Sequence, residues 1–300
     1  MNRGLVAALI TVAIWSWPAI FIKFLSRDFD VITQNFFRYL AASLFLWLYC
    51  AVFSRPKLFP IRGNLRNILL PSFLVFLFQI VWVQAVYLTT PTTATLLSKL
   101  DIVFVALLSF FFLKGERKIL GSKYFLMGAS LALLGVVGVV LGRATELRTE
   151  FNLGVALLLL RSLLWSSYII SVRNLVIKVE PIVAATWVYS FATLFFLPMV
   201  LVLGDIYKVA EVPAYVNLIL FGSGVLCVGI GNATNYIATR YLGATIPAIL
   251  LLLTPFLTGV FSYLIFAEVL NLPQILSGLL ILLGCWVIIR KVVIGVAWQG

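Results

Sequence analysis

The sequence contains no histidine and few charged residues, and both absences narrow the range of possible functions. Charged residues make up 11% of the 300 residues, whereas a soluble domain typically has about 25%. Hydrophobic residues account for 63% of the chain, so it lacks the polar surface that water requires. The absence of histidine excludes imidazole metal sites and histidine-based catalytic triads.

Cysteine is also scarce, and no nucleotide-binding motif is present. Cys50, Cys227 and Cys285 lie in apolar runs without a CxxC pair, a pattern typical of small buried residues rather than a disulfide or metal framework. The sequence contains no GxxxxGK[ST] motif, so ATP hydrolysis by a P-loop is excluded. We therefore expect no catalytic residues, no metal and no cofactor.

Long apolar runs take the place of these features. The mean hydropathy is +1.14, which indicates that lipid faces most of the surface, and a membrane-spanning helix needs about 20 apolar residues. The sequence predicts an all-α membrane protein with ten transmembrane helices, at residues 4–25, 31–53, 67–89, 92–113, 121–142, 152–174, 181–204, 214–239, 244–266 and 271–293.

The net charge of +12 is distributed unevenly between the predicted loops. With the N-terminus in the cytoplasm, fourteen of the 22 Lys and Arg residues lie inside and three lie within spans, which leaves on the outside Lys23, Arg27, Arg143, Arg148 and Lys208. Cytoplasmic loops are enriched in basic residues, so we predict a multi-pass protein of the cell membrane with both termini cytoplasmic. Aromatic residues do not interleave the basic loops, which argues against nucleic-acid binding.

The two halves of the chain resemble each other. Several positions recur at an offset of 150 residues: Trp15 and Trp165, Lys23 and Arg173, Asp30 and Glu180, and Gly128 and Gly278. The repeat divides the chain into residues 1–150 and 151–300, each with five predicted spans. Because five is odd, the second copy enters the membrane from the opposite side. Inverted repeats of this kind occur in many secondary transporters and support alternating access.

Short motifs in these repeats resemble those of the EamA-type transporters of the drug/metabolite transporter superfamily. The motifs are Trp15-Ser16 with Lys23, Phe37-Arg38-Tyr39, Leu113-Lys114-Gly115-Glu116-Arg117, Leu253-Thr254-Pro255, and Glu268 with Gly278 and Gly284. The resemblance implies two five-helix repeats around a central cavity. The first repeat departs from the pattern, because Asp101 and Ile102 stand where a counterpart of Pro255 would be expected.

Four ionisable side chains lie well inside the predicted spans: Arg38, Lys99, Asp101 and Arg161. Each costs about 2.5–3.5 kcal/mol to place in a membrane helix. At 1.5 Å per residue all four lie roughly 10–13 Å from the outer face, so they share one layer with a net charge of about +2.

Asp101 needs a partner from another helix, and Arg161 and Arg38 are both at the right depth. In one interpretation, Asp101 forms a structural ion pair and Lys99 extends toward the interface. In the other, the excess cations face a wet cavity and bind an anionic or zwitterionic solute. Proton coupling through Asp101 is disfavoured, because a nearby arginine stabilises the charged carboxylate.

Aromatic and amide side chains complete a candidate solute site. The predicted set comprises Trp15, Arg38, Gln79, Lys99, Asp101, Arg161, Trp165, Tyr168, Asn232 and Asn235. Amides also join neighbouring helices and aromatics also pack or anchor at interfaces, so both interpretations stay open for these side chains. Pro18, Pro247 and Pro255 remove backbone hydrogen bonds inside spans and are candidate bends of gating helices.

The sequence therefore predicts a secondary transporter or facilitator. Its solute would be a small organic molecule, such as an amino acid or a related metabolite, moved outward by alternating access. Lipid handling and a structural or sensory role are the alternatives. Membrane lipid is an expected partner. The glycines of the fifth and tenth spans, Gly128, Gly135, Gly138, Gly278 and Gly284, could pack helices within one chain or between chains.

Overall fold

The computed structural model describes residues 3–53, 65–112, 123–141, 149–242, 247 and 250–288. These residues form helices and connecting turns, with no strand among them. The motif 113–117 lies wholly outside the described residues. Many of the basic residues behind the predicted orientation are undescribed too: Arg55, Lys57, Arg62, Lys114, Arg117, Lys118, Arg143, Arg148, Arg290 and Lys291. The placement of both termini in the cytoplasm stays a prediction.

The helices of the described residues are named in chain order. In order they are α1 (Arg3–Trp15), α2 (Pro18–Leu25), α3 (Val31–Phe53), α4 (Leu65–Leu88), α5 (Pro91–Leu97), α6 (Asp101–Phe112), α8 (Lys123–Leu141), α9 (Thr149–Val176), α10 (Pro181–Leu203), α11 (Lys208–Glu211), α12 (Ala214–Ser223), α13 (Gly231–Leu242), α15 (Thr254–Phe266) and α16 (Leu272–Ile288).

Six helical segments among the described residues are long and apolar enough to cross a membrane. They are Arg3–Leu25, Val31–Phe53, Leu65–Leu88, Leu153–Val176, Pro181–Leu203 and Ala214–Leu242. Shorter apolar helices lie at Lys123–Gly135, Leu251–Phe266 and Leu272–Val287. Because a single span satisfies its backbone only as a helix, these segments define an all-helical, multi-pass membrane protein.

Local side-chain chemistry explains where several helices begin. Asp30 Oδ1 accepts hydrogen bonds from the backbone N–H groups of Ile32 (2.8 Å) and Thr33 (2.9 Å) at the start of α3. Thr90 caps α5 in the same way, and Pro91 occupies its first position. Both devices satisfy or remove N–H groups that have no partner within the helix.

Four of the predicted spans are interrupted in the described part of the chain; in the ninth, the interruption is the 3-10 turn η6 (Leu251–Leu253) before α15. The first breaks at Ser16 and Trp17, between α1 and α2. The fourth contains a 3-10 turn, η2 (Ser98–Leu100), between α5 and α6. The eighth contains a π-helical segment, η5 (Gly224–Ile230), between α12 and α13. A π segment accommodates an extra residue per turn and is frequent at functional sites.

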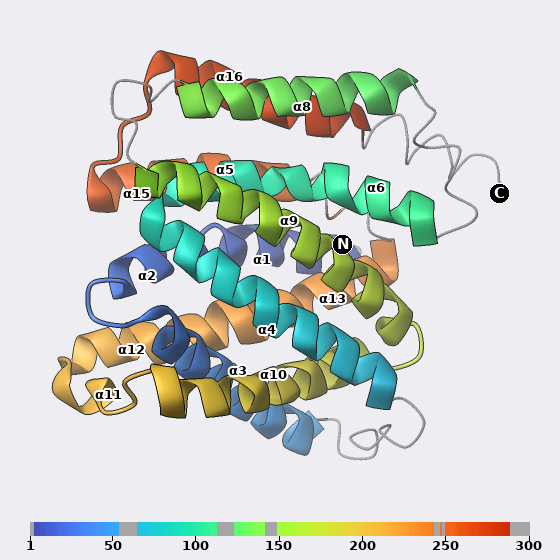
Figure 1. Ribbon diagram of the computed structural model, residues 1–300. Coiled ribbons are helices and arrows are strands. Elements are labelled where there is room, and N and C mark those ends of the chain that lie inside the picture. Colours follow the sequence, from blue (N-terminus) through green and yellow to red (C-terminus); the bar gives the residue numbers. More distant parts are fainter. Residues whose placement is uncertain are drawn as a thin grey trace.

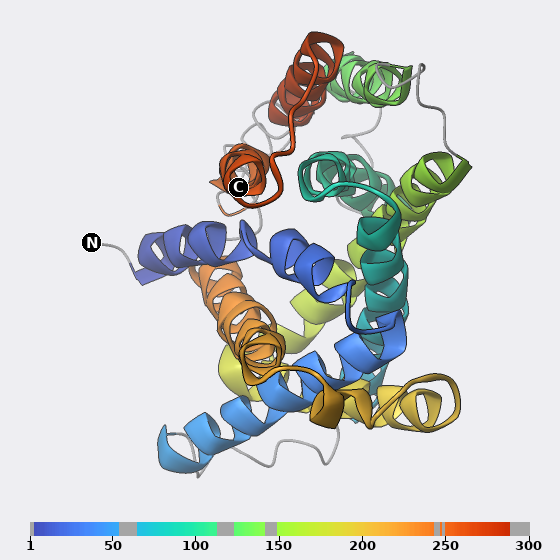
Figure 2. The ribbon, with the colours of Figure 1, turned by 90° about the vertical axis from the view of Figure 1, so that its left-hand side faces the viewer.

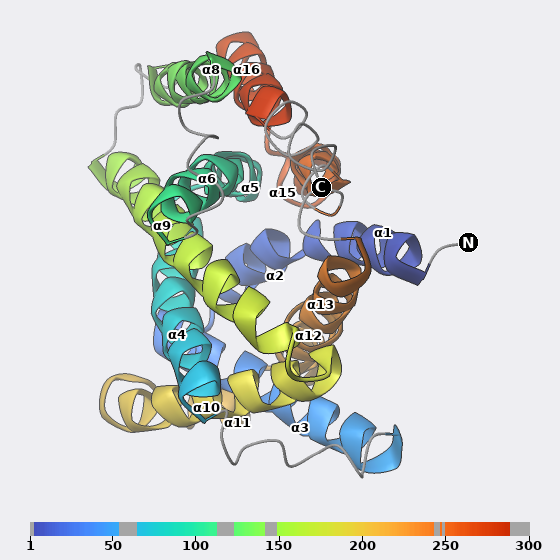
Figure 3. The same ribbon diagram turned by 90° about the vertical axis from the view of Figure 1, so that its right-hand side faces the viewer.

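Helices from the two halves of the chain pair with one another. Figure 1 shows α8 and α16 side by side along one edge and α3 and α10 along the opposite edge, and Figures 2 and 3 show the same separation. Between these edges α4 packs on α9, and α1 packs on α13. The largest cluster of buried apolar residues lies among α3, α4, α9, α10 and α13.

Glycine allows the closest of these approaches. A Cβ atom on Gly284 of α16 would lie 2.7 Å from the backbone nitrogen of Ala132 in α8, and it would also contact Gly128. Gly135 of α8 faces Ser277 and Ile281 of α16 in turn. The sequence left open whether these glycines pack helices within one chain or between chains. In the structure, Gly284 and Gly135 pack α8 against α16 within one chain.

Candidate functional site

The buried ion pair between Asp101 and Arg161 is the centre of the candidate site. Asp101 is the first residue of α6 and Arg161 lies on α9, so the pair joins two helices. Nη1 of Arg161 donates to Oδ1 (2.7 Å) and to Oδ2 (2.5 Å) of Asp101. Each residue is 9% exposed. The sequence allowed Arg161 or Arg38 as the partner of Asp101, and in the structure Asp101 pairs with Arg161.

Three aromatic rings surround the guanidinium group of Arg161. Its Cζ atom lies 5.0 Å from the ring centroid of Trp82, 5.3 Å from that of Trp165 and 5.8 Å from that of Phe78. Cation–π attraction acts at these distances, more strongly where water is excluded. The rings therefore stabilise the cation together with Asp101. Its Nε atom is nevertheless buried without a hydrogen-bond partner among the described residues.

Phe78 and Trp82 did not belong to the predicted site. They lie four residues apart on α4 and so face the same neighbour, α9. That spacing was visible in the sequence, since residues four apart share one face of a helix. The sequence does not reveal that α9 packs against this face of α4, and so it could not connect the two rings with Arg161.

Lys99 lies close to this pair in sequence but makes no ion pair with a described residue. It belongs to the 3-10 turn η2 and is partly exposed. Its backbone carbonyl accepts a hydrogen bond from Sγ of Cys285 at 3.2 Å. The turn therefore packs against α16, while the ammonium group remains without a described carboxylate.

Arg38 is buried in a different helix contact, between α3 and α12. Nε of Arg38 donates to Oγ of Ser223 at 3.1 Å, and the residue is 2% exposed. The backbones meet closely, because a Cβ atom on Gly224 would lie 2.8 Å from Cα of Arg38. No carboxylate of the described part of the chain pairs with this guanidinium. Ser223 was missing from the predicted site, and no sequence signal connects it with Arg38.

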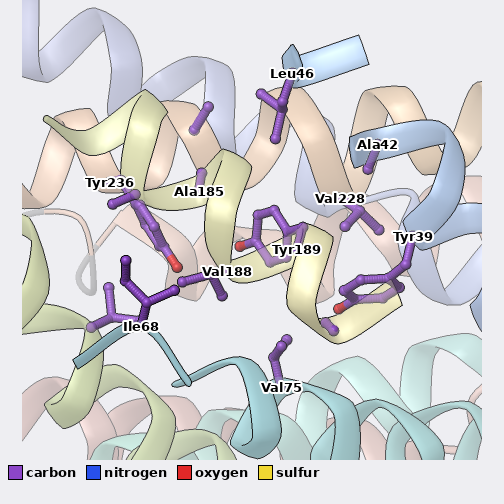
Figure 4. Close-up of a cluster of buried hydrophobic side chains, with 14 of the residues drawn as sticks. Tyr39, Ala42, Leu46, Ile68, Val75, Ala185, Val188, Tyr189, Val228 and Tyr236 are labelled. Carbon is purple, nitrogen blue, oxygen red and sulfur yellow. The ribbon is translucent and has the colours of Figure 1, made fainter. Parts of the chain in front are cut away.

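Tyr168 belongs to a separate cluster of buried tyrosines rather than to the Arg161 group. Its hydroxyl lies 3.0 Å from that of Tyr189 and also bonds the hydroxyl of Tyr236. The ring of Tyr39 packs edge-on against Tyr189 at 5.7 Å. Figure 4 shows Tyr39, Tyr189 and Tyr236 in one row among apolar side chains. Phe78 connects the cluster with the Arg161 group, since its ring lies 5.3 Å from that of Tyr168.

Among the described residues, no hydrogen bond joins a predicted amide side chain to Arg161, and Asn232 bonds to the backbone instead. Nδ2 of Asn232 donates to the carbonyls of Val228 (2.9 Å) and Cys227 (3.4 Å), which belong to the π segment. This contact matches the packing interpretation. Asn235 is buried on α13, and Gln79 is partly buried on α4. Their solute-binding role stays a prediction.

Trp15 and Trp165 occupy different surroundings despite their equivalent positions in the repeat. Trp165 contacts Arg161, as described above. Trp15 ends α1, and its indole lies against Gly231, where a Cβ atom would be 2.7 Å from Nε1. Trp15 therefore packs on α13 and is separated from the ion pair.

The three predicted bending prolines differ in what surrounds them. Pro18 begins α2 directly after the break at Ser16 and Trp17, and so the first span bends there. Pro255 lies in the first turn of α15, after a 3-10 turn over Leu251–Leu253. Pro247 is buried, and the residues beside it lie outside the described part of the chain.

An apolar hollow of about 740 Å³ lies beside α16, and none of the predicted site residues belongs to its lining in the described part of the chain. It is lined by side chains of the η6 turn and α16: Leu252, Leu276, Leu279, Leu280, Leu282, Leu283 and Trp286. The described residues that line it are all apolar, so it suits hydrocarbon and not a polar solute.

These observations define a multi-pass helical membrane protein with charged and aromatic side chains enclosed within the bundle. The EamA-like transporter family model matches residues 2–141 and 152–290. The chain therefore belongs to the EamA-like transporter family, as the motifs predicted, and this membership places it among proteins of membrane transport.

Relatives agree with this assignment. The chain is 23% identical over 288 residues to an uncharacterized transporter of Haemophilus influenzae, covering 90% of this chain and 91% of the relative. It is 26% identical over 286 residues to an uncharacterized transporter of Archaeoglobus fulgidus, covering 94% and 96%. A solved structure, titled only as the crystal structure of a protein, has the same fold, with a TM-score of 0.66 at 18% identity over 95% of this chain and 96% of that one.

Proposed function

We propose that this protein is a secondary transporter or facilitator that exports small anionic or zwitterionic organic solutes, such as amino acids or related metabolites, across the cell membrane. In this proposal ten membrane-spanning segments form two inverted repeats, residues 1–150 and 151–300. The repeats alternate between outward-open and inward-open arrangements around a central site. Both termini lie in the cytoplasm.

The observation that carries the proposal is the pairing of α3 with α10. Both helices have 23 residues, and α10 begins 150 residues after α3. Contacts run in opposite directions along them: Ser43 bonds Thr193 (3.1 Å), Trp47 bonds Ser190 (2.9 Å) and Cys50 bonds Thr186 (3.3 Å). Equivalent helices that pair antiparallel are related by a two-fold axis perpendicular to them. Such an axis lies in the membrane plane, which is the symmetry of inverted repeats.

A second pair of contacts supports the same axis. Gly4 of α1 packs on Leu242 of α13, where an added Cβ atom would lie 2.7 Å from Cγ of the leucine. Gly154 of α9 packs on Leu88 of α4, where an added Cβ atom would lie 3.1 Å from Cβ of the leucine. The glycines are 150 residues apart and the leucines 154, so the α1–α13 contact and the α4–α9 contact are equivalent.

The preference for an anionic group follows from the charges in the bundle. Asp101 neutralises Arg161. Arg38 and Lys99 have no described carboxylate partner, so the layer keeps an excess of positive charge. A buried cation without a counter-ion is strongly disfavoured. A bound carboxylate or phosphate group would provide that counter-ion, and arginine can bind it through two parallel hydrogen bonds.

The interruptions of the spans support movement between two arrangements. The break before Pro18, the 3-10 turn beside Lys99 and the π segment from Gly224 to Ile230 lie inside membrane segments. Pro18, Pro247 and Pro255 would act as bends of the moving helices. Such irregular backbone is tolerated within a membrane where it is enclosed by protein or lines a wet cavity.

Counterflow in proteoliposomes tests this function. The purified protein would be reconstituted with a panel of unlabelled amino acids and organic anions inside, and uptake of the corresponding labelled solute would be measured. We expect solute-dependent uptake for at least one anionic or zwitterionic compound. Lys99→Met should reduce that uptake at least tenfold, whereas Lys178→Met, which changes an exposed lysine, should not. Absence of uptake across the panel would refute the proposal.

Lipid handling is the second candidate function, and the apolar hollow beside α16 favours it. Its leucine lining is open on one side, so an acyl chain could enter from the bilayer. The same liposomes, prepared with fluorescent phospholipids, would report it. Lipid transfer between leaflets without any solute counterflow would favour this alternative.

A further inference from the structure

Lys23, one of the motif residues, caps the end of a neighbouring helix. Its Nζ atom donates to the backbone carbonyls of Tyr87 (2.8 Å), Thr89 (2.8 Å) and Val86 (3.3 Å). These carbonyls lie at the C-terminal end of α4, where the helix provides no partner and carries a partial negative charge. The ammonium group of Lys23 in α2 therefore caps the C-terminal end of α4 and joins the two helices.

Glu268, another motif residue, caps the start of the next helix. Oε2 of Glu268 accepts hydrogen bonds from Oγ1 of Thr92 (2.7 Å), from its backbone N–H group (3.2 Å) and from Oγ of Ser262 (2.5 Å). Thr92 lies in the first turn of α5, where a carboxylate matches the positive end of the helix. Because α4 ends at Leu88 and α5 begins at Pro91, the two charged groups hold opposite sides of one turn.

The two capping residues belong to segments that are themselves joined. The ring of Trp17 stacks on that of Phe261 in α15 with centroids 4.3 Å apart. Oγ1 of Thr258 in α15 donates to the carbonyl of Ser16 at 2.8 Å. Thus α2 and α15 form one unit, and Lys23 and Glu268 attach it to the unit of α4 and α5. Figure 1 shows α2, α5 and α15 together at one end of the bundle.

The backbone beside Glu268 is strained in this arrangement. Ala267 has φ 53°, and it is the one non-glycine residue with a positive φ in the described part of the chain. This left-handed conformation is unfavourable for residues with a Cβ atom. It persists only where the surrounding contacts impose it, and it is common at switch regions. Oε1 of Glu268 is also buried without a described partner, so the contact has unsatisfied features that its release would relieve.

The equivalent position in the second half differs. Arg173 follows Lys23 by 150 residues and lies near the end of α9, where it is exposed, whereas Lys23 is partly buried. Figure 1 shows α9 ending on the side of the bundle away from α2, α5 and α15. Lys23 and Arg173 thus differ in exposure although they are equivalent in the repeat.

We propose that Lys23 and Glu268 are gate residues that close the solute path at the end of the bundle formed by α2, α5 and α15. This proposal rests on the proposed transport function, because it assigns the contact to one of the alternating conformations. When the path opens at this end, the α4–α5 turn separates from α2 and α15, and both charged groups lose their partners together.

Thiol labelling tests the gate without requiring transport. Ala94 lies on α5 behind the contact and is fully buried, so Ala94→Cys places a reporter there. A membrane-impermeant maleimide would be added to the reconstituted protein, and labelling at position 94 would be followed by mass spectrometry. We expect slow labelling in the otherwise native chain. Lys23→Met and Glu268→Gln should each accelerate it at least tenfold, and Lys23→Arg should restore the slow rate.

Arg27→Met is the matched control, since it removes an exposed cation four residues after Lys23 and should leave the rate unchanged. Unchanged labelling in both Lys23→Met and Glu268→Gln, with folding retained, would overturn the gate. An equal increase in Arg27→Met would also overturn it. If Lys23→Met fails to fold, Glu268→Gln decides alone, because it removes the negative charge of the cap and keeps the side-chain shape that folding requires.

The outcome is separable from that of the transport assay. Solute counterflow with unchanged labelling would refute the gate and leave the transporter. Accelerated labelling without counterflow for any solute would support movement at this contact and refute its assignment to solute transport.

Discussion

Removing Asp101 and removing Arg161 from their buried ion pair should lower the free energy of unfolding by different amounts. Removing one partner of a buried ion pair costs about 3–5 kcal/mol, because the other charge stays buried without compensation. After Asp101→Asn, the cation of Arg161 still faces three aromatic rings at 5.0–5.8 Å. At about 0.5–1 kcal/mol for each ring, these contacts offset part of the loss. After Arg161→Met, the carboxylate of Asp101 keeps no ion-pair partner among the described residues.

We therefore expect Asp101→Asn to cost about 2–3 kcal/mol and Arg161→Met about 4–5 kcal/mol of unfolding free energy. The double variant Asp101→Leu with Arg161→Met should cost less than either single change, because apolar replacement of a buried pair is often neutral or stabilising. The coupling energy between the two positions should exceed about 2 kcal/mol.

Unfolding in detergent, followed by circular dichroism during a denaturant titration, would provide the four free energies of this cycle. Lys208→Met is a suitable control, because it removes an exposed ion pair with Glu211 at 2.9 Å and should leave the transition unchanged. Additive costs, with coupling below about 0.5 kcal/mol, would refute the reasoning and with it the contact between α6 and α9.

Three further changes follow from the packing. Gly284→Ala should destabilise the protein by about 1–3 kcal/mol through overpacking against α8, whereas Gly222→Ala, which meets nothing within 4 Å, should not; thermal unfolding of the two variants makes the comparison. Tyr168→Phe should cost about 1–3 kcal/mol because two buried hydroxyls lose their shared partner, and Tyr263→Phe, at an exposed position, should cost nothing measurable in the same assay. Ala267→Gly should raise the midpoint of thermal unfolding by relieving about 1 kcal/mol of left-handed backbone strain, and a lower midpoint would contradict that strain.

The helical membrane class was readable from the sequence because it depends on composition and run length alone. The depth argument for Asp101 also succeeded, since the rise per residue places Arg161 at the same level without knowledge of the packing. Both predictions use one helix at a time. They therefore need no information on which helices are neighbours.

The surroundings of the charged groups could not be read in this way. Phe78 and Trp82 share a face of α4, but only the pairing with α9 places them on Arg161. Asn232 has the composition of a site residue and instead bonds the carbonyl of Val228 in a π segment. No periodicity in the sequence reveals one extra residue in a helical turn. Lys23 was counted as a loop cation for the same reason, because the helix end that it caps is distant along the chain.

The proposed symmetry of the repeats and the chemistry of the site are separate features of this chain. Arg161 has its equivalent, at an offset of 150 residues, in Thr11, whose hydroxyl donates to Thr234 on α13 at 2.9 Å. Arg38 has its equivalent in Val188, a buried apolar residue. These two charged groups are thus not duplicated at that offset. An inverted pair of repeats would supply two nearly equivalent conformations, while a solute would meet the same asymmetric set of cations in both. Solute charge would then be selected by single residues, and a change at Arg38 or Lys99 would alter selectivity without altering the exchange between conformations.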